Sequence, residues 1–176
     1  MHADVASSTP QRSTAASSPV GLDELLDLDA PALLRLYKGA RVPRLTDVAG
    51  DLRGRMLAVP SLSGRAADAV RAFARSDRFP WRGKSFRPFD DTRGEGINRV
   101  VVDRFRLYPF QTFIGPSKAG DFDAVQLDYD LPANPFFIRA IRDEIRELSP
   151  GLYLGQAHVR IGGAYRLWLY FGLERR

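Results

Sequence analysis

The chain has 176 residues, a formal net charge of +5 and no cysteine. This length suits one domain with a sizeable core. The lack of cysteine excludes a disulfide framework, a thiolate nucleophile and every cysteine-ligated metal site, and it favours a cytoplasmic location. The sequence holds no apolar run near the ~20 residues that a membrane-spanning helix needs.

The charged residues are dispersed along the chain. Nearly all basic residues are arginines, interleaved with acidic ones as in "RAIRDEIRE", and no block of five like charges occurs. Such a surface is more often solvated than used as a track for phosphates. We therefore expect no nucleic-acid partner, because that affinity depends on clustered phosphate contacts.

Residues 1–20 are rich in Ser, Thr, Ala and Pro and hold almost no large apolar residue. Such a segment buries too little surface to offset its ordering entropy, so it is predicted to be a disordered tail. It lacks the apolar core of a signal peptide, although a transit peptide is an alternative. Residues 21–176 are predicted to form a single domain.

The first part of this domain is predicted to be largely helical. Leucines recur at helical spacing over residues 22–38, and Pro31 divides the stretch into two pieces. A strand is expected over residues 52–59. A short helix is expected over residues 63–77, with Ser63 or Gly64 as its cap.

From Phe79 onward the pattern is that of strands. Stretches rich in β-branched and aromatic residues alternate with turn signals such as "DDTRGEG" and "GPSKAGD". We expect strands over residues 79–89, 97–105, 106–115, 122–130, 152–161 and 164–174.

One late helix is predicted between these strands, over residues 135–148. Asn134 is a favourable N-cap and Pro135 suits the first helical position. The helix would present one apolar stripe, formed by Phe137, Ile138, Ile141, Ile145 and Leu148.

The predicted fold is mainly β: a curled antiparallel sheet or a closed barrel, with helices at the N-terminal side. An α+β cone of the nuclear-transport-factor-like kind is the alternative, and the late helix between strands counts against it. In its order of elements, the region 79–176 resembles lipocalin-like (calycin) barrels. It departs from them at Trp81, which follows Phe79–Pro80 where such barrels often carry a Gly-x-Trp element. The resemblance implies a cup-shaped cavity for an apolar or amphipathic molecule.

The last two strands suggest a site. Gly162–Gly163 predicts a two-residue hairpin turn. With simple pairing, Gln156, His158 and Arg160 share a face with apolar residues of the final strand. Polar groups in an apolar cavity are typical of small-molecule sites. The alternative is that these side chains meet solvent or a carboxylate and that His158 is structural. The predicted substrate-binding residues are Gln156, Tyr165, Leu154, Leu167, Leu169, Phe171, Tyr108 and Gln111.

The function predicted from these features is the binding and transformation of a small, largely apolar molecule by a cofactor-independent cyclase, isomerase or lyase. His158 would be the general acid or base, and Arg160 would stabilise negative charge. The alternatives are a carrier with the same cavity and an interaction domain with a filled core. No metal is expected, because the other histidine, His2, lies in the tail. "GKS" at 83–85 does not complete a phosphate-binding loop, since the first glycine position is Arg78.

Overall fold

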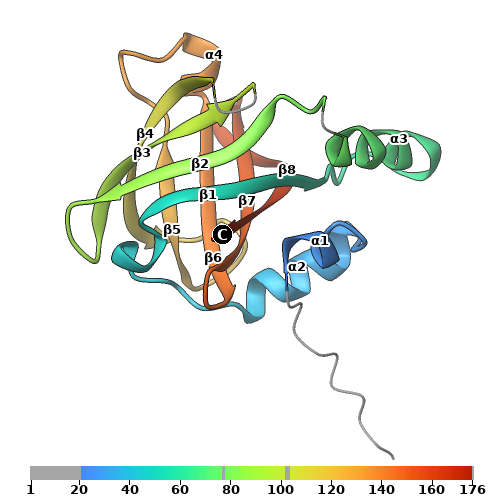
Figure 1. Ribbon diagram of the computed structural model, residues 1–176, viewed down its shortest axis with the longest axis horizontal. Coiled ribbons are helices and arrows are strands. Elements are labelled where there is room, and N and C mark those ends of the chain that lie inside the picture. Colours follow the sequence, from blue (N-terminus) through green and yellow to red (C-terminus); the bar gives the residue numbers. More distant parts are fainter. Residues whose placement is uncertain (1–20, 77, 102–103, 176) are drawn as a thin grey trace, which may run out of the picture.

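The computed structural model describes residues 21–76, 78–101 and 104–175 (Figure 1). The predicted disordered tail, residues 1–20, lies outside the described residues. The helices are α1 (Leu22–Leu25), α2 (Ala30–Gly39), the 3-10 helix η1 (Leu45–Val48), α3 (Gly64–Arg75) and α4 (Phe136–Arg139). The strands are β1 (Gly50–Ala58), β2 (Trp81–Pro88), β3 (Arg93–Val100), β4 (Phe105–Pro116), β5 (Asp123–Asp128), β6 (Ile141–Ser149), β7 (Leu152–Ile161) and β8 (Ala164–Arg175).

The strands form a closed antiparallel barrel. Each strand pairs with the next along the chain, and β8 also pairs with β1. The prediction of a closed barrel is confirmed, and the α+β cone is wrong. Closure leaves no strand edge exposed, because every strand has a neighbour on both sides.

The N-terminal helices cover part of the outer face of the barrel. The side chain of Asp29 accepts a hydrogen bond of 2.8 Å from the backbone N–H of Ala32, which caps α2. This cap and Pro31 account for the predicted break between α1 and α2. Apolar residues of these helices pack on outward-facing side chains of β7 and β8: Leu22, Leu25, Leu33 and Tyr37 against Leu154 and Tyr170.

The late helix is much shorter than predicted. It begins as expected but ends at Arg139, and the rest of the predicted span forms β6. The Ile141 and Ile145 spacing fits a helix and also one face of a strand. Pairing with β5 and β7 favours the strand over the helix, because the barrel would stay open without β6. Tertiary pairing here overrides a local helical pattern.

The final hairpin turns at Gly162–Gly163 as predicted, and its register holds for the four pairs from Ile161↔Ala164 to His158↔Leu167. A β-bulge then shifts the pairing, so that Ala157 faces Leu169 and Trp168 has no partner. Because of this extra residue, each side chain of β8 beyond the bulge lies on the opposite face of the sheet, relative to β7, from the face predicted for it. The predicted grouping of β7 and β8 side chains on one face is therefore wrong beyond the bulge.

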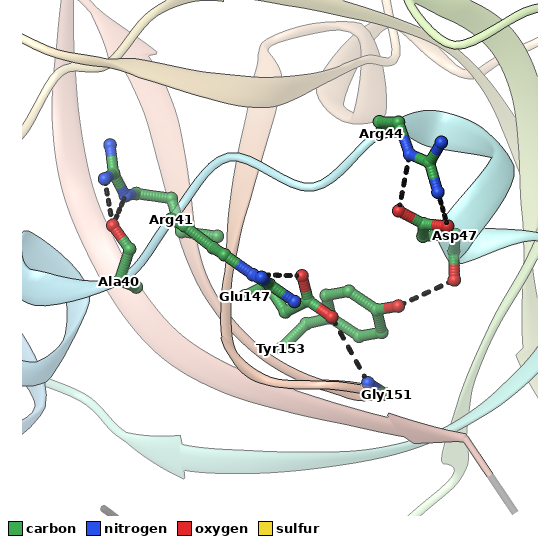
Figure 2. A network of polar contacts seen from close by, with 8 residues as sticks. Ala40, Arg41, Arg44, Asp47, Glu147, Gly151 and Tyr153 are labelled. Carbon is green, nitrogen blue, oxygen red and sulfur yellow. Dashed lines mark hydrogen bonds and ion pairs between the residues drawn. The ribbon is translucent and has the colours of Figure 1, made fainter.

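One end of the barrel is closed by the segment between α2 and β1. Leu45 and Val48 of this segment are fully buried in the barrel core. Around them, Arg41 pairs with Glu147 at 2.8 Å, and the Tyr153 hydroxyl donates to the Asp47 carbonyl at 2.8 Å (Figure 2). This segment thus closes the barrel core at this end.

Among the described helices, none combines the length and the apolar character required to cross a bilayer.

Candidate active site in the barrel mouth

A cavity of about 320 Å³ lies inside the barrel at the end opposite the α2–β1 segment. Its volume is at the lower end of the roughly 300–1,000 Å³ that small-molecule sites occupy. Most of its wall is apolar, and the lining residues are Met56, Phe79, Trp81, Lys84, Asn98, Val100, Tyr108, Tyr129, Ile138, Ile141, Asp143, Ala157, Trp168, Leu169 and Phe171. A larger hollow of about 620 Å³ at the closed end is lined in part by two ion pairs, Arg41–Glu147 and Arg44–Asp47.

The polar part of the mouth cavity is one hydrogen-bonded cluster around Lys84, which is only 3% exposed. Its ammonium nitrogen lies 2.9 Å from Asp143 Oδ2, 2.5 Å from the Tyr129 hydroxyl and 2.8 Å from Asn98 Oδ1. An ammonium has three N–H donors, so each of them has an acceptor here. The cluster draws on β2, β3, β6 and the residue after β5.

A bulge in β2 directs Lys84 inward. The pairing of β2 with β3 shifts between Trp81 and Gly83, which brings Trp81 and Lys84 to the same inner face. Gly83 has a φ of +131°, and a Cβ there would lie 2.0 Å from the backbone oxygen of Leu52. Only glycine fits both the conformation and the close approach.

Burial controls the titration of this cluster. Desolvation lowers the pKa of Lys84 below its ordinary value, and the carboxylate of Asp143 opposes the shift. Desolvation and then the charge of Asp143 raise the pKa of Tyr129 well above its ordinary value, so its hydroxyl keeps its proton. Aromatic rings surround the ammonium, and three with centroids 5.2–5.4 Å from Nζ contribute cation–π attraction: Trp81, Phe110 and Phe171.

One acceptor of the cluster is unused. Asp143 Oδ1 is buried and has no hydrogen-bond partner among the described residues, while Oδ2 accepts from Lys84 and Tyr129. Buried polar atoms without a partner are uncommon in folded proteins. Since Asp143 lines the cavity, a ligand hydroxyl, amine or acidic C–H would find this oxygen available.

Tyr108 is strained where it meets the cavity. Its φ of +60° is unusual for a residue other than glycine, and it lies where the pairing of β3 and β4 shifts by one residue. Asn98 Nδ2 donates to its carbonyl oxygen at 3.1 Å. The bulge brings Tyr108 against the cavity and ties it to the Lys84 cluster through Asn98.

The structure divides the predicted site residues between the two faces of the wall. Tyr108, Leu169 and Phe171, which the sequence assigned to substrate binding, line the mouth cavity. The others do not: Leu154, Gln156, His158, Arg160, Tyr165 and Leu167 lie on the outer side of β7 and β8, and Gln111 is exposed on β4. Placing His158 and Arg160 in the cavity was wrong, because the bulge at Trp168 was not visible in the sequence.

His158 and Gln156 instead border a second buried polar cluster outside the barrel, centred on Glu144. Its carboxylate is fully buried and accepts from Ser117 Oγ at 2.8 Å, from the Lys118 backbone N–H at 3.1 Å and from Gln126 Nε2 at 3.2 Å. Desolvation lowers the pKa of His158, with Glu144 acting in the opposite direction. The β4–β5 loop covers this cluster.

Of the four residues of the Lys84 cluster, sequence reasoning missed Lys84, Asn98 and Asp143, and it considered Tyr129 only as one of several residues that could hydrogen-bond a ligand. The sequence did contain a signal for Lys84. It is one of three lysines in an arginine-rich chain, and it lies two residues before Phe86 in a predicted strand, so both side chains should lie on the same face. Asp143 lies within the predicted helix over residues 135–148 but outside its apolar stripe, which concealed it. No local signal joins the four, because their sequence separations are large.

Among the described residues, no group of three or more His, Cys, Asp or Glu side chains is arranged to hold a metal ion. No protein-family model matches the chain, and no curated protein is similar to it in sequence. A crystal structure of a protein from Thermomonospora curvata is similar in fold, with a TM-score of 0.51 and 15% sequence identity, over 88% of this chain and 92% of that one. At this identity the likeness concerns the fold alone.

Proposed function

We propose that the barrel binds a small, largely apolar molecule with one polar group in its mouth cavity and transforms it without a cofactor, as an isomerase, lyase or cyclase. The observation that carries this proposal is the buried Lys84–Asp143–Tyr129 cluster at an apolar cavity, with one carboxylate oxygen unused. Titratable groups that burial perturbs, in a cavity of this size, are typical of acid–base sites.

The chemistry that this cluster suits is proton transfer next to a carbonyl group. The positive charge of Lys84 would stabilise the negative charge that develops on the carbonyl oxygen. Asp143 Oδ1 would take a proton from the neighbouring carbon or hydroxyl. The Tyr129 hydroxyl accepts from Lys84 and donates to Asp143 Oδ2 at 3.0 Å, so it links the two groups. These residues take over the roles that the sequence assigned to Arg160 and His158.

The closed antiparallel barrel with an apolar cavity at one end also supports a relationship to lipocalin-like (calycin) barrels, which forms part of this proposal. Such a relationship does not by itself select an activity, because one fold hosts many functions.

A carrier with the same cavity is the second candidate, and one observation favours it. All three N–H donors of Lys84 already have acceptors within the protein. If these hydrogen bonds persist when a ligand binds, Lys84 would only stabilise the cavity wall, and apolar contacts would hold the ligand.

Binding is tested with a neutral fluorescent probe, N-phenyl-1-naphthylamine. Ala157 lines the cavity, so Ala157→Phe should fill it and abolish the fluorescence increase. Ala72→Phe, at an exposed position of α3, is the matched control and should bind the probe like the wild type. If the wild type gives no signal, or both variants behave alike, the proposed cavity function is wrong.

Catalysis is tested with a panel of β,γ-unsaturated and β-hydroxy ketones, whose isomerisation or dehydration produces an absorbing conjugated enone. Asp143→Asn should abolish turnover and keep probe binding. Glu144→Gln changes the next residue of the same strand, which faces outward, and should keep the activity. Probe binding by the wild type without turnover of any ketone would favour the carrier.

A further inference from the structure

The open end of the barrel carries an unusual surface, and the topology defines its extent. In a barrel whose strands pair in sequence order, alternate connections lie at the same end. The connections at the cavity end are residues 59–80, which contain α3, 101–104, 129–140, which contain α4, and 162–163, and residues 77, 102 and 103 among them lie outside the described residues. With the adjoining strand ends, the four segments are residues 59–80, 101–107, 129–140 and 160–168. We call this surface the mouth face.

Exposed apolar side chains are concentrated on the mouth face. Of ten large hydrophobic residues that are exposed among the described residues, nine belong to its four segments: Leu62, Phe73, Val101, Phe105, Leu107, Phe136, Phe137, Ile161 and Trp168. The exception is Phe89, after β2 at the other end. Single exposed apolar residues need no explanation, but a gathering of this kind marks an interaction site.

The apolar surface continues into the cavity. On α4, Ile138 lines the cavity while its neighbours Phe136 and Phe137 are 84% and 56% exposed. At the other side of the opening, Phe73 of α3 contacts Phe79 edge-to-face at 5.4 Å between ring centroids, and Phe79 lines the cavity. The exposed rings therefore surround the opening through which a ligand would pass.

One face of α3 is apolar in sequence and largely exposed. Ala66, Ala69 and Phe73 follow helical spacing and are exposed and Val70 of the same face is half-buried, whereas Ala74 is the buried residue of this helix. Figure 1 shows α3 projecting beside the barrel. A helix with one exposed apolar stripe and basic residues along it is typical of a segment that lies on a lipid surface.

The charge of the molecule is concentrated on the same face. The four segments hold nine arginines and four aspartates in sequence, and two of these aspartates, Asp77 and Asp103, lie outside the described residues. Their net charge equals that of the whole chain, +5. Arg104, Arg160 and Arg166 are exposed and make no salt bridge with any described residue. Positive charge beside exposed aromatic rings matches an anionic bilayer in both sign and polarity.

We infer that the mouth face docks on the surface of an anionic lipid bilayer, with its aromatic rings at the level of the headgroups and the cavity opening toward the lipid. This inference goes beyond the proposed function and needs no ligand. One consequence, that an apolar ligand enters the cavity from the bilayer, rests on the proposed function.

The test is co-sedimentation of the full chain with vesicles, without any cavity ligand. We expect binding to phosphatidylcholine vesicles that contain phosphatidylglycerol, little binding to phosphatidylcholine alone, and release at high salt. Phe136→Ser with Phe137→Ser should weaken binding at least about tenfold, from the lost apolar burial. Phe89→Ser, the exposed aromatic of the opposite end, should leave it unchanged.

Charge is tested separately. Arg104→Gln and Arg166→Gln should each weaken binding about fivefold, whereas Arg93→Gln at the opposite end should have no effect. Circular dichroism confirms that each variant is folded.

Three results would overturn the inference: equal binding to neutral and anionic vesicles, no binding to either, or a loss of binding in Phe89→Ser equal to that in the Phe136→Ser, Phe137→Ser variant. A wild-type dimer that Phe136→Ser with Phe137→Ser converts to monomers would also overturn it, since the occupant would then be a second copy. Cavity binding of the neutral probe is a separate measurement, so the two proposals can fail independently.

Discussion

Asp143 and Glu144 are neighbours on β6, yet they belong to opposite sides of the barrel wall. Asp143 points inward to Lys84 and Tyr129, beside the mouth cavity. Glu144 points outward and is enclosed by the loop that carries Ser117 and Lys118. Both carboxylates are buried and each has a lysine partner, with Nζ–O distances of 2.9 Å and 3.7 Å.

The difference lies in what supports each charge. Glu144 accepts hydrogen bonds from Ser117, a backbone N–H and Gln126, and the Lys118 ammonium adds only an ion pair at 3.7 Å. Asp143 depends on Lys84 and Tyr129, and its second oxygen is unpartnered. The outer cluster is built as a structural support, whereas the inner one keeps capacity for a ligand.

The largest expected effect is at the inner lysine. Lys84→Met leaves Asp143 buried without its counter-charge and should lower the free energy of unfolding by about 3–5 kcal/mol. Lys118→Met should cost less than about 2 kcal/mol, because Glu144 retains its other donors. Urea unfolding of both variants measures the two values. Equal losses would show that the two clusters are equivalent.

A second variant sharpens this result. Lys84→Met combined with Asp143→Leu removes both charges, and replacing a buried ion pair by apolar residues is often neutral or stabilising. We expect the double variant to recover most of the loss of Lys84→Met in urea unfolding. A double variant as unstable as Lys84→Met alone would mean that packing, and not the unpaired charge, caused the loss.

Removing the inner hydroxyl should have a smaller effect. Tyr129→Phe deprives Lys84 of one acceptor and Asp143 of one donor, at a cost of about 1–3 kcal/mol. Tyr165→Phe, on the outer side of β8, should change the free energy of unfolding little. Thermal or urea unfolding of the two variants gives the comparison, and a Tyr165→Phe loss matching that of Tyr129→Phe would contradict it.

The smallest effect concerns the outer cluster and pH. The pKa of His158 is lowered in the folded protein, mainly by desolvation, while Glu144 and Asp143 oppose the shift and Lys118 adds to it. Below about pH 6.5 the unfolded chain therefore binds more protons at this residue than the folded protein does. Stability should fall as the pH decreases from 6.5 toward the lowered pKa.

In His158→Gln this part of the pH dependence should disappear, while carboxylates still titrate at lower pH. Unfolding by urea at a series of pH values between 5 and 8 checks it. An unchanged slope in the variant would assign the effect to another group.

The sequence predicted the barrel more successfully than the site. The break at Pro31 and the Gly162–Gly163 turn were local signals, and both are confirmed. The strand patterns located every strand except β6, although the strand predicted over residues 97–105 forms as Arg93–Val100. The late helix was wrong beyond Arg139, because isoleucines four residues apart suit a helix face and a strand face alike. The site was displaced to the outer side of β7 because one bulged residue, Trp168, reverses the faces of β8.

By itself, the sequence determined the class of this protein: a chain without cysteine whose alternating apolar strands and glycine turns close into a barrel with helices at its N-terminal side. Local periodicity is enough for this, because it sets which elements form. Tertiary structure alone decided which residues meet inside. Lys84, Asn98, Tyr129 and Asp143 come together through the closure of the barrel and the bulges in β2 and β4, and such long-range pairing leaves no trace in any single stretch of sequence.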